Sequence, residues 1–381
     1  MTPLHENEEH ARLRAEARRF ARTEIRPHAD AWEEDEEFPR ELYARAAAAG
    51  LIGIGYPEAY GGGGGDVSHA IAASEEMILE GTSVGTCVGL GSHGIALPPI
   101  LKFGTEEQKQ RFVPPVLRGE KIAALAITEP VAGSDVAGIA TRAVRDGDHY
   151  VIDGSKTFIT SGTRADLVTV AVRTGGAGHA GISMIVVERG TPGFSVTRKL
   201  AKTGWWASDT AELAFESCRV PAANLIGEEN AGFYAIMANF VTERLYLASN
   251  CCAISELAYR ESVSWARERR AFGKPIAGFQ VTRHKLADMA SSIAAARALL
   301  SDVVVRFLGG DASAPKLAAM AKNVATDACS FVCDQAVQIH GGTGYMRGTV
   351  VERLFRDARL YPIGGGTREI MNEIIAKLEG Y

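Results

Sequence analysis

The residues of this chain that could do chemistry lie in four stretches. Two of them, 127–135 and 154–162, gather hydroxyl side chains and glycines. The third contains Arg269, whose planar guanidinium can bind a phosphate through paired hydrogen bonds. The fourth contains Glu243, a carboxylate that could accept a proton as a general base. Each also has an ordinary interpretation, because hydroxyls cap turns and Glu-Arg pairs commonly lie on exposed helix faces.

Composition places the chain among globular proteins. It has 381 residues, enough for two or three domains, with 46% apolar and 23% charged residues. The formal net charge of −5 argues against a nucleic-acid surface, because the basic cluster at 267–270 is local. We therefore expect no nucleic-acid partner.

The sequence also predicts where the protein works. No apolar run approaches the ~20 residues of a membrane-spanning helix. The N-terminal stretch 1–9 is polar and acidic, unlike a signal or transit peptide. These features predict a cytoplasmic protein without a membrane partner.

The six cysteines predict neither a disulfide framework nor a metal site. They form no CxxC pair, and no pair of ligating histidines accompanies Cys329 and Cys333, which could share a helix face. We expect buried, reduced thiols and no bound metal.

Three segments of different texture follow one another, with predicted domains at 1–120, 121–228 and 229–381. The first is helical: residues 8–25 have apolar residues at helical spacing, and Pro27 follows as a stop. The glycine run 61–65 lacks a strand-to-helix setting, so a flexible turn is preferred to a phosphate-binding loop.

The middle segment is predicted to form an antiparallel sheet or barrel. Its short β-branched runs are separated by Gly, Asp or Asn turns, and they lie at 140–144, 150–152, 167–172, 182–187 and 211–215. The last segment is again helical, with helix boundaries expected at Pro275, Pro315 and Pro362. Long Ala-rich amphipathic helices joined by short loops favour a helix bundle.

Several motifs, in order, resemble the acyl-CoA dehydrogenase family. They are ITEPVAGSD at 127–135, GSKTFITSG at 154–162, TERL at 242–245, RRAFGKPI at 269–276 with Phe279-Gln280, QIHGGTGY at 338–345 and YPIGGGT at 361–367. Together they span most of the chain. The resemblance implies an α+β fold: a helical N-terminal domain, a middle antiparallel β domain and a C-terminal four-helix bundle.

The resemblance also implies an FAD cofactor. A flavin needs small residues near its ring and hydrogen-bond donors at its edge. The implied FAD contacts are Ile127, Thr128, Gly133, Ser134, Phe158, Ile159, Thr160, Arg269, Phe272, Gln280, Gln338, Gly341, Gly342, Thr367 and Glu369. In the family the arginine matched by Arg269 reaches the FAD of another subunit, so a dimer at least, and usually a homotetramer, is implied.

The catalytic residues implied by the family are Glu243 and Gly365. Many members carry a catalytic glutamate where this chain has Gly365, which cannot take a proton. Thr242-Glu243-Arg244-Leu245 is similar to the place where the isovaleryl and long-chain enzymes carry the base on a helix. The backbone N–H at position 365 would still polarise the thioester carbonyl. Ser134, Arg244 and Gly366 are the implied contacts to acyl-CoA.

One departure from the family pattern lies in GWWASDT, at 204–210. Trp206 stands where relatives often have arginine or lysine, and Lys199 or Lys202 could supply the missing charge. The sequence does not decide whether they do.

The implied reaction is FAD-dependent dehydrogenation of an acyl-CoA to the trans-2-enoyl-CoA, a step of fatty acid β-oxidation. Electrons would pass to an electron-transfer flavoprotein. A glycine at 365 and a base on a helix favour branched or long acyl chains. Two alternatives stay open: a flavin oxidase that uses oxygen, and a catalytically idle flavoprotein of the same fold.

Overall fold

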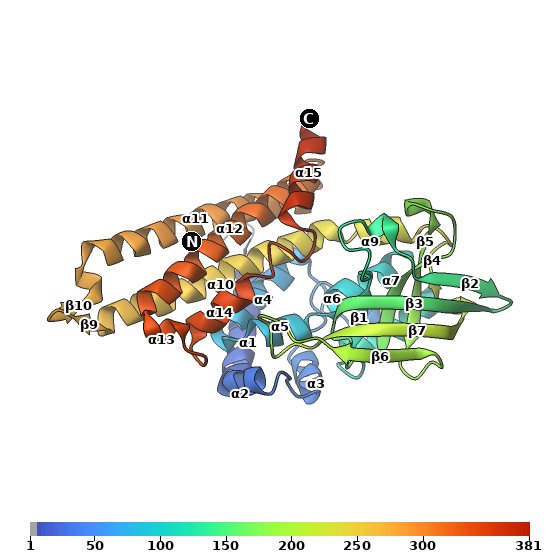
Figure 1. Cartoon of the computed structure of the whole chain (residues 1–381), viewed down its shortest axis with the longest axis horizontal. Coiled ribbons are helices and arrows are strands. Elements are labelled where there is room, and N and C mark those ends of the chain that lie inside the picture. The colour runs from blue at the N-terminus through green and yellow to red at the C-terminus, as the bar shows by residue number, and fades with distance from the viewer. Residues whose placement is uncertain (1–5) are drawn as a thin grey trace.

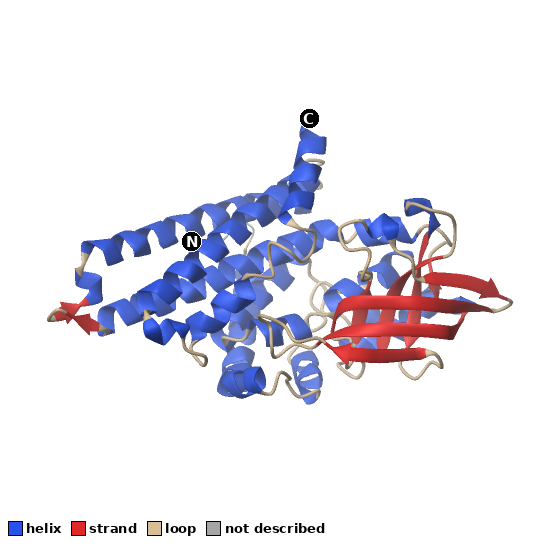
Figure 2. Ribbon diagram, in the orientation of Figure 1, coloured by secondary structure: helices blue, strands red, loops and turns tan. Residues whose placement is uncertain are grey.

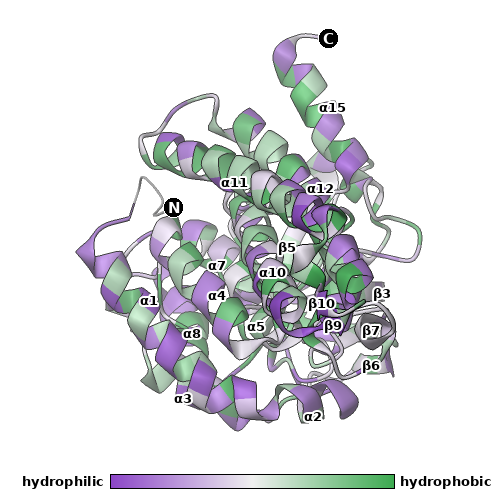
Figure 3. Ribbon diagram, turned by 90° about the vertical axis from the view of Figure 1, so that its left-hand side faces the viewer, coloured by the Kyte–Doolittle hydropathy of each residue, from purple (hydrophilic) through white to green (hydrophobic). Residues whose placement is uncertain are grey.

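The computed structural model describes residues 6–381, and its N-terminal part is helical. Side-chain caps start several of these helices: Asn7, Asp66 and Thr105 each form a capping box. The helices are α1 (Glu8–Phe20), α2 (Ala29–Glu34), α3 (Glu41–Ala48), α4 (Val67–Gly81), α5 (Val84–Leu90), α6 (His93–Ala96), α7 (Pro98–Phe103) and α8 (Glu106–Leu117). Figure 3 shows hydrophobic and hydrophilic residues interleaved along α1 and α3, as expected when one face packs on a core.

The first helix ends earlier as an α-helix than the sequence predicts. The predicted helix over 8–25 is divided into α1 and a π-helical turn, Ala21–Ile25. Pro27 lies in the 3₁₀ turn Arg26–His28 that follows, so the stop falls where proline removes a backbone donor. The glycine run 61–65 is a loop between Glu58–Tyr60 and α4, as predicted.

The middle part is one twisted sheet of eight strands (Figure 2). Its order is β6-β7-β3-β2-β4-β5-β8, and β1 pairs with β4. The strands are β1 (Ala123–Ala126), β2 (Arg142–Asp146), β3 (His149–Thr160), β4 (Leu167–Arg173), β5 (Ile182–Glu188), β6 (Phe194–Lys199), β7 (Thr210–Pro221) and β8 (Leu225–Ile226). Pairing is antiparallel except where β4 meets β1 and β2 in parallel, so the sheet is mixed.

All five predicted strands are present, and three were missed. β6 is missed because it is exposed along most of its length and its apolar alternation is limited to Phe194 and Val196. β1 is alanine-rich, and β8 has two residues. β1 matters most, because the loop 127–135 leaves the sheet from its end.

The C-terminal part is dominated by three long helices. Its elements are α9 (Gly232–Met237), α10 (Phe240–Glu268), β9 (Arg270–Ala271), β10 (Lys274–Pro275), α11 (Gln280–Leu308), α12 (Ala314–His340), α13 (Gly342–Tyr345), α14 (Val350–Ala358) and α15 (Arg368–Glu379). α10, α11 and α12 pack on one another, and α14 packs against α10 and α12 to complete a four-helix bundle (Figure 1). Pro275, Pro315 and Pro362 all lie at or between helix boundaries, as predicted.

The sheet meets the helical parts through α6, which packs on β1, and through α9, which packs on β5, whereas α4 and α10 join the two helical parts to each other. The secondary structure changes between α8 and β1 and between β8 and α9, which supports the proposed domain boundaries at 120 and 228.

All six cysteines are buried and unpaired. Among residues 6–381 no single helix is long and apolar enough to cross a membrane. Only the bent pair Val84–Leu90 and His93–Phe103, at 42°, passes that test of length and composition together.

Candidate active site

A cavity of about 1340 Å³ lies where all three parts of the chain meet. The N-terminal part contributes apolar side chains, including one face of α4, and the sheet contributes the loops after β1 and β6 and the end of β3. The bundle contributes the first turns of α10 and the loop before α15. The wall is mostly apolar with a few polar groups, which is typical of a small-molecule site.

Glu243 lies in the first turn of α10 and lines this cavity. Its carboxylate faces the glycine loop, because a Cβ atom on Gly365 would lie 3.3 Å from its Oε1 atom. Burial raises the pKa of the Glu243 carboxyl, and the positive charges of Arg244 and Lys322 oppose that rise. The position near the N-terminus of a helix also favours the ionised form. Glu243 is thus a partly desolvated carboxylate with cationic support.

The loop opposite Glu243 adopts a backbone shape that suits glycine. Gly365 and Gly366 have φ angles of +64° and +93°, in the left-handed region. The carbonyl of Gly366 accepts a hydrogen bond of 2.5 Å from Nζ of Lys322, a buried residue of α12. Thr367 caps α15 by accepting from the N–H of Ile370 at 3.3 Å. These two contacts fix the C-terminal end of the loop, where it joins α15.

The predicted flavin-side residues come together. The seven that line the same cavity as Glu243 are Ile127, Thr128, Gly133, Ser134, Phe158, Ile159 and Thr160. Phe158 stays 68% exposed with a φ of +60°, so its ring lies at a mouth of the cavity. Gly133 has open space where a Cβ atom would lie, so crowding does not dictate a glycine there.

A buried ion pair holds the loop that leaves β1. Nζ of Lys156 donates to Oε1 of Glu129 at 2.7 Å and to the carbonyl of Ile127 at 2.9 Å. Glu129 also accepts from the backbone N–H groups of Ala140 and Thr141. Burial lowers the pKa of Lys156 to about 8, against the opposing pull of Glu129. Because the N–H of Thr157 donates to the carbonyl of Thr128, this network fixes the hydroxyl-bearing turn on β3.

A second set of predicted residues lies elsewhere. Arg269 is the C-cap of α10, 26 residues from Glu243, so the two lie roughly 40 Å apart along one helix. Six of the predicted FAD contacts lie at that far end and are exposed: Arg269, Phe272, Gln280, Gln338, Gly341 and Gly342. They do not line the cavity, whereas Thr367 and Gly366 do. Glu369 is exposed in the first turn of α15. One chain therefore does not gather the whole predicted set.

Arg244, a predicted contact to acyl-CoA, lies beside Glu243 but is not part of the cavity wall. The side chain of Arg244 is buried behind Glu243, over the ring of Phe240 at 5.4 Å, and it does not line the cavity. Its Nε atom has no hydrogen-bond partner among the described residues. The charge of Arg244 favours the ionised form of Glu243, and its contact with acyl-CoA stays a prediction.

Trp206 has its ring against two arginines. The guanidinium carbons of Arg356 and Arg347 lie 3.7 and 4.5 Å from its ring centroid. Lys199 and Lys202 bond backbone carbonyls, those of Glu36 and Ser208. Two arginines of the C-terminal part therefore lie beside Trp206, and Arg356 is also paired with Glu352.

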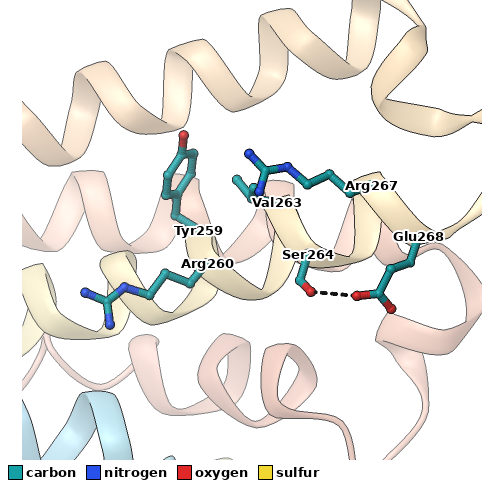
Figure 4. Close-up of a pocket in the computed structure, with 6 residues that line it drawn as sticks. All are labelled: Tyr259, Arg260, Val263, Ser264, Arg267 and Glu268. Atoms are coloured by element: carbon teal, nitrogen blue, oxygen red, sulfur yellow. Dashed lines mark hydrogen bonds between the residues drawn. The ribbon is translucent and has the colours of Figure 1, made fainter.

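A second hollow, of about 520 Å³, lies on the outer face of α10 (Figure 4). Six side chains from three turns line it: Tyr259, Arg260, Val263, Ser264, Arg267 and Glu268. Ser264 donates to Glu268 at 2.9 Å, and four of the six residues are exposed. None of these six residues is among the predicted site residues.

Family models match nearly the whole chain. The N-terminal, middle and C-terminal domains of acyl-CoA dehydrogenase match residues 7–120, 124–218 and 230–379. The chain belongs to the acyl-CoA dehydrogenase family. The family and the three-part fold predicted from the sequence are thereby confirmed.

Individual acyl-CoA dehydrogenases agree with this assignment. An acyl-CoA dehydrogenase of Bacillus subtilis is 41% identical over 98% of both chains. The mitochondrial long-chain specific enzyme of Sus scrofa is 40% identical over 97% of this chain and 86% of that protein. The crystal structure of a putative acyl-CoA dehydrogenase from Mycobacterium smegmatis superposes with a TM-score of 0.97, at 48% identity over 98% of both chains. The protein is therefore an oxidoreductase that acts on CH–CH groups.

Acyl-CoA dehydrogenases bind FAD, as predicted. One solved structure, from Bacillus anthracis, is complexed with FAD; it is 31% identical, with a TM-score of 0.92 over 100% of this chain and 70% of that one. The cavity fits such a group, because hydroxyls of Thr128, Ser134 and Thr160 lie on its wall beside apolar surface.

Sequence reasoning missed two residues that shape this site. Lys322 and Leu247 lie on α12 and α10 within otherwise unremarkable amphipathic helices. Leu247 follows Glu243 by four residues, so helical spacing from the candidate base was the available signal. Nothing in the sequence around Lys322 distinguishes it from a surface lysine.

Proposed function

We propose that this protein dehydrogenates an acyl-CoA thioester to the trans-2-enoyl-CoA, with Glu243 as the catalytic base. The observation that supports it is the carboxylate of Glu243 inside the cavity, facing Gly365. An α-proton beside a thioester is weakly acidic, so the base must be ionised, desolvated and close to the substrate. The cavity offers one such carboxylate on the bundle side.

The residues of the chain have separate proposed roles in this reaction. Glu243 takes the α-proton. The N–H of Gly365 is the proposed donor to the thioester carbonyl, where it stabilises the negative charge that develops as the proton leaves. The apolar walls exclude water and strengthen both interactions. FAD, when bound beside Thr128, Ser134, Phe158 and Thr160, supplies the acceptor for the hydride from the β-carbon.

The two separated groups of residues support a shared site. The exposed far-end set around Arg269 lies roughly 40 Å from Glu243 on one helix, so the proposal assigns it to the FAD of a second subunit. Its fixed guanidinium suits a pyrophosphate. The functional unit is then a dimer at least, and a homotetramer by analogy with the family.

The proposed electron acceptor is an electron-transfer flavoprotein. Phe158, exposed at a mouth of the cavity, leaves one edge of the proposed flavin position accessible from outside. An oxidase would instead consume oxygen, and an idle flavoprotein would pass no electrons at all. Oxygen uptake by the substrate-reduced protein separates the first alternative from the proposal.

Mixing the purified holoprotein with a panel of acyl-CoAs tests the function, with loss of the oxidised flavin absorbance as the readout. Because the base is on a helix and position 365 has no side chain, we expect the highest kcat/KM for a long-chain or branched acyl-CoA. A highest kcat/KM for butyryl-CoA would contradict that preference. No bleaching with any acyl-CoA would contradict the dehydrogenase activity itself.

A further inference from the structure

We propose that Lys322 is a positioning residue for the dehydrogenation: it fixes the Gly365–Gly366 loop and supplies a positive charge that faces Glu243. This inference rests on the proposed function of Glu243 as the base. It adds to that function a residue outside the cavity wall. This residue stabilises the ionised form of the base and fixes the loop opposite it.

The contacts of Lys322 are unusual for a lysine. Lys322 is 1% exposed on α12, and lysines are rarely buried to this extent without a specific partner. Nζ donates to the carbonyl of Gly366 at 2.5 Å, across from α12 to the loop before α15. No carboxylate lies in salt-bridge distance of Nζ among residues 6–381. The ammonium is therefore hydrogen-bonded to a neutral carbonyl group. Because no carboxylate neutralises its positive charge, that charge acts on nearby titratable groups.

That charge acts on the candidate base. Lys322 and Arg244 both favour the ionised form of Glu243, against the opposing effect of burial on its pKa. Reciprocally, burial lowers the pKa of Lys322 to about 8, and Cys251 and Glu243 resist that change. Lys322 thus remains charged at neutral pH, where the base must be ionised.

The other groups around this pair do not replace Lys322. α10 contributes Glu243, Arg244 and Cys251. The loop 362–367 contributes no titratable side chain, and Arg368 at the start of α15 pairs with Asp327 at the surface. The residues of α4 that line the cavity are uncharged. Without Lys322, Arg244 would be the one cation of this group left beside Glu243.

Substitutions can separate the two roles of Lys322. Lys322→Gln keeps a donor for the Gly366 carbonyl but removes the charge. Lys322→Arg keeps the charge, and Lys322→Met removes both charge and donor. Lys316→Gln is the matched control, because Lys316 lies on the same helix and pairs with Glu379 at 2.9 Å away from the cavity. FAD content and circular dichroism establish that each holoprotein is folded.

The readout is the rate of flavin bleaching by a saturating acyl-CoA from about pH 5.5 to about pH 8.5. We expect Lys322→Gln to lose about tenfold or more at the acid end, because less Glu243 is ionised, and to approach the wild-type rate near pH 8. Lys322→Arg should keep the acid limb of the wild type. Lys322→Met should be slower at every pH, because the loop is no longer fixed.

A Lys322→Gln protein with normal FAD content and the wild-type pH profile would overturn the proposal. A uniform loss at all pH values in Lys322→Gln would also overturn it, since a merely structural lysine predicts that result. If Lys322→Met does not fold, the Gln and Arg variants still decide. If none of the acyl-CoAs bleaches the flavin of the wild type, the proposed function fails instead. The two failures are therefore distinguishable.

Discussion

The space beside Gly365 is occupied by Leu247. A Cβ atom built on Gly365 would overlap Cδ1 of Leu247, and Glu243 lies one helical turn before Leu247 on the same face of α10. A side chain at position 365 is thus blocked by this contact and further disfavoured by the left-handed φ of +64°. A base at position 243 of α10 and a glycine at position 365 therefore go together, because the helix that carries the base also fills the space beside the loop.

The first prediction concerns moving the base. Gly365→Glu placed in a Glu243→Gln background should not restore bleaching, because Leu247 fills the site. Adding Leu247→Ala should restore part of the rate, since it removes the obstructing methyl groups. The measurement is the bleaching rate of the double and triple variants, with Glu243→Gln/Leu247→Ala as the control. Equal recovery with and without Leu247→Ala would show that Leu247 is no obstacle.

The second prediction concerns Glu243 itself. Glu243→Gln keeps size and polarity but cannot accept a proton, so the reductive half-reaction should slow by about 10²- to 10⁴-fold or more. FAD content and acyl-CoA binding should be retained, because the loss is confined to the transition state. Rapid mixing with acyl-CoA measures the rate. A variant as fast as the wild type would return Glu243 to the ordinary role of a helix-face carboxylate.

The third prediction concerns cofactor retention. Arg269→Ala removes the proposed cation for the FAD pyrophosphate and should lower FAD per chain, with little effect on folding. Arg267→Ala is the matched control, because both side chains are exposed near the end of α10. Flavin absorbance after gel filtration reports occupancy. Equal occupancy in the two variants would count against the role of Arg269.

The fourth prediction concerns pH and stability. Asp357 is fully buried, and burial together with Glu33 raises its pKa to about 7 while Arg356 and Arg353 oppose this. Its folded pKa lies above the usual 3.8, so the folded state binds more protons between about pH 4 and pH 7. Wild-type stability should therefore fall through this window as the pH rises.

Asp357→Asn removes that titration and retains an oxygen for the N–H of Trp205, which donates to Asp357 at 2.6 Å. We expect the apparent Tm of the variant, relative to the wild type, to rise by about 1–2 °C between pH 5 and pH 7.5. Thermal unfolding at several pH values checks this. Parallel Tm curves for the two proteins would show that Asp357 does not titrate in the window.

Much of the fold followed from local patterns. Prolines 275, 315 and 362 marked helix boundaries because a missing N–H cannot be compensated within a helix. The exposed strand β6 was not predicted, because its pairing with β7 is set by the rest of the sheet and its apolar alternation is limited to Phe194 and Val196. Pairing between distant strands is a tertiary property.

The candidate site, like the fold, could be predicted from the sequence only in part. Glu243 and the hydroxyl-bearing turn at Thr128 could be predicted from the family motifs, and they lie around one cavity. Lys322 could not, because its meaning depends on the carbonyl of Gly366, 44 residues away in sequence. The inward position of Arg244 was likewise set by helix packing, one residue from a side chain that faces the cavity.

The length of α10 has a genetic consequence under the proposed shared site. With the base at one end of the rod and the phosphate-binding arginine at the other, each complete centre draws its parts from two polypeptides. A subunit lacking Glu243 and a subunit lacking Arg269 are both defective alone. Paired with each other, they would form one centre carrying both lesions and one carrying neither, so two inactive alleles would complement within a single oligomer.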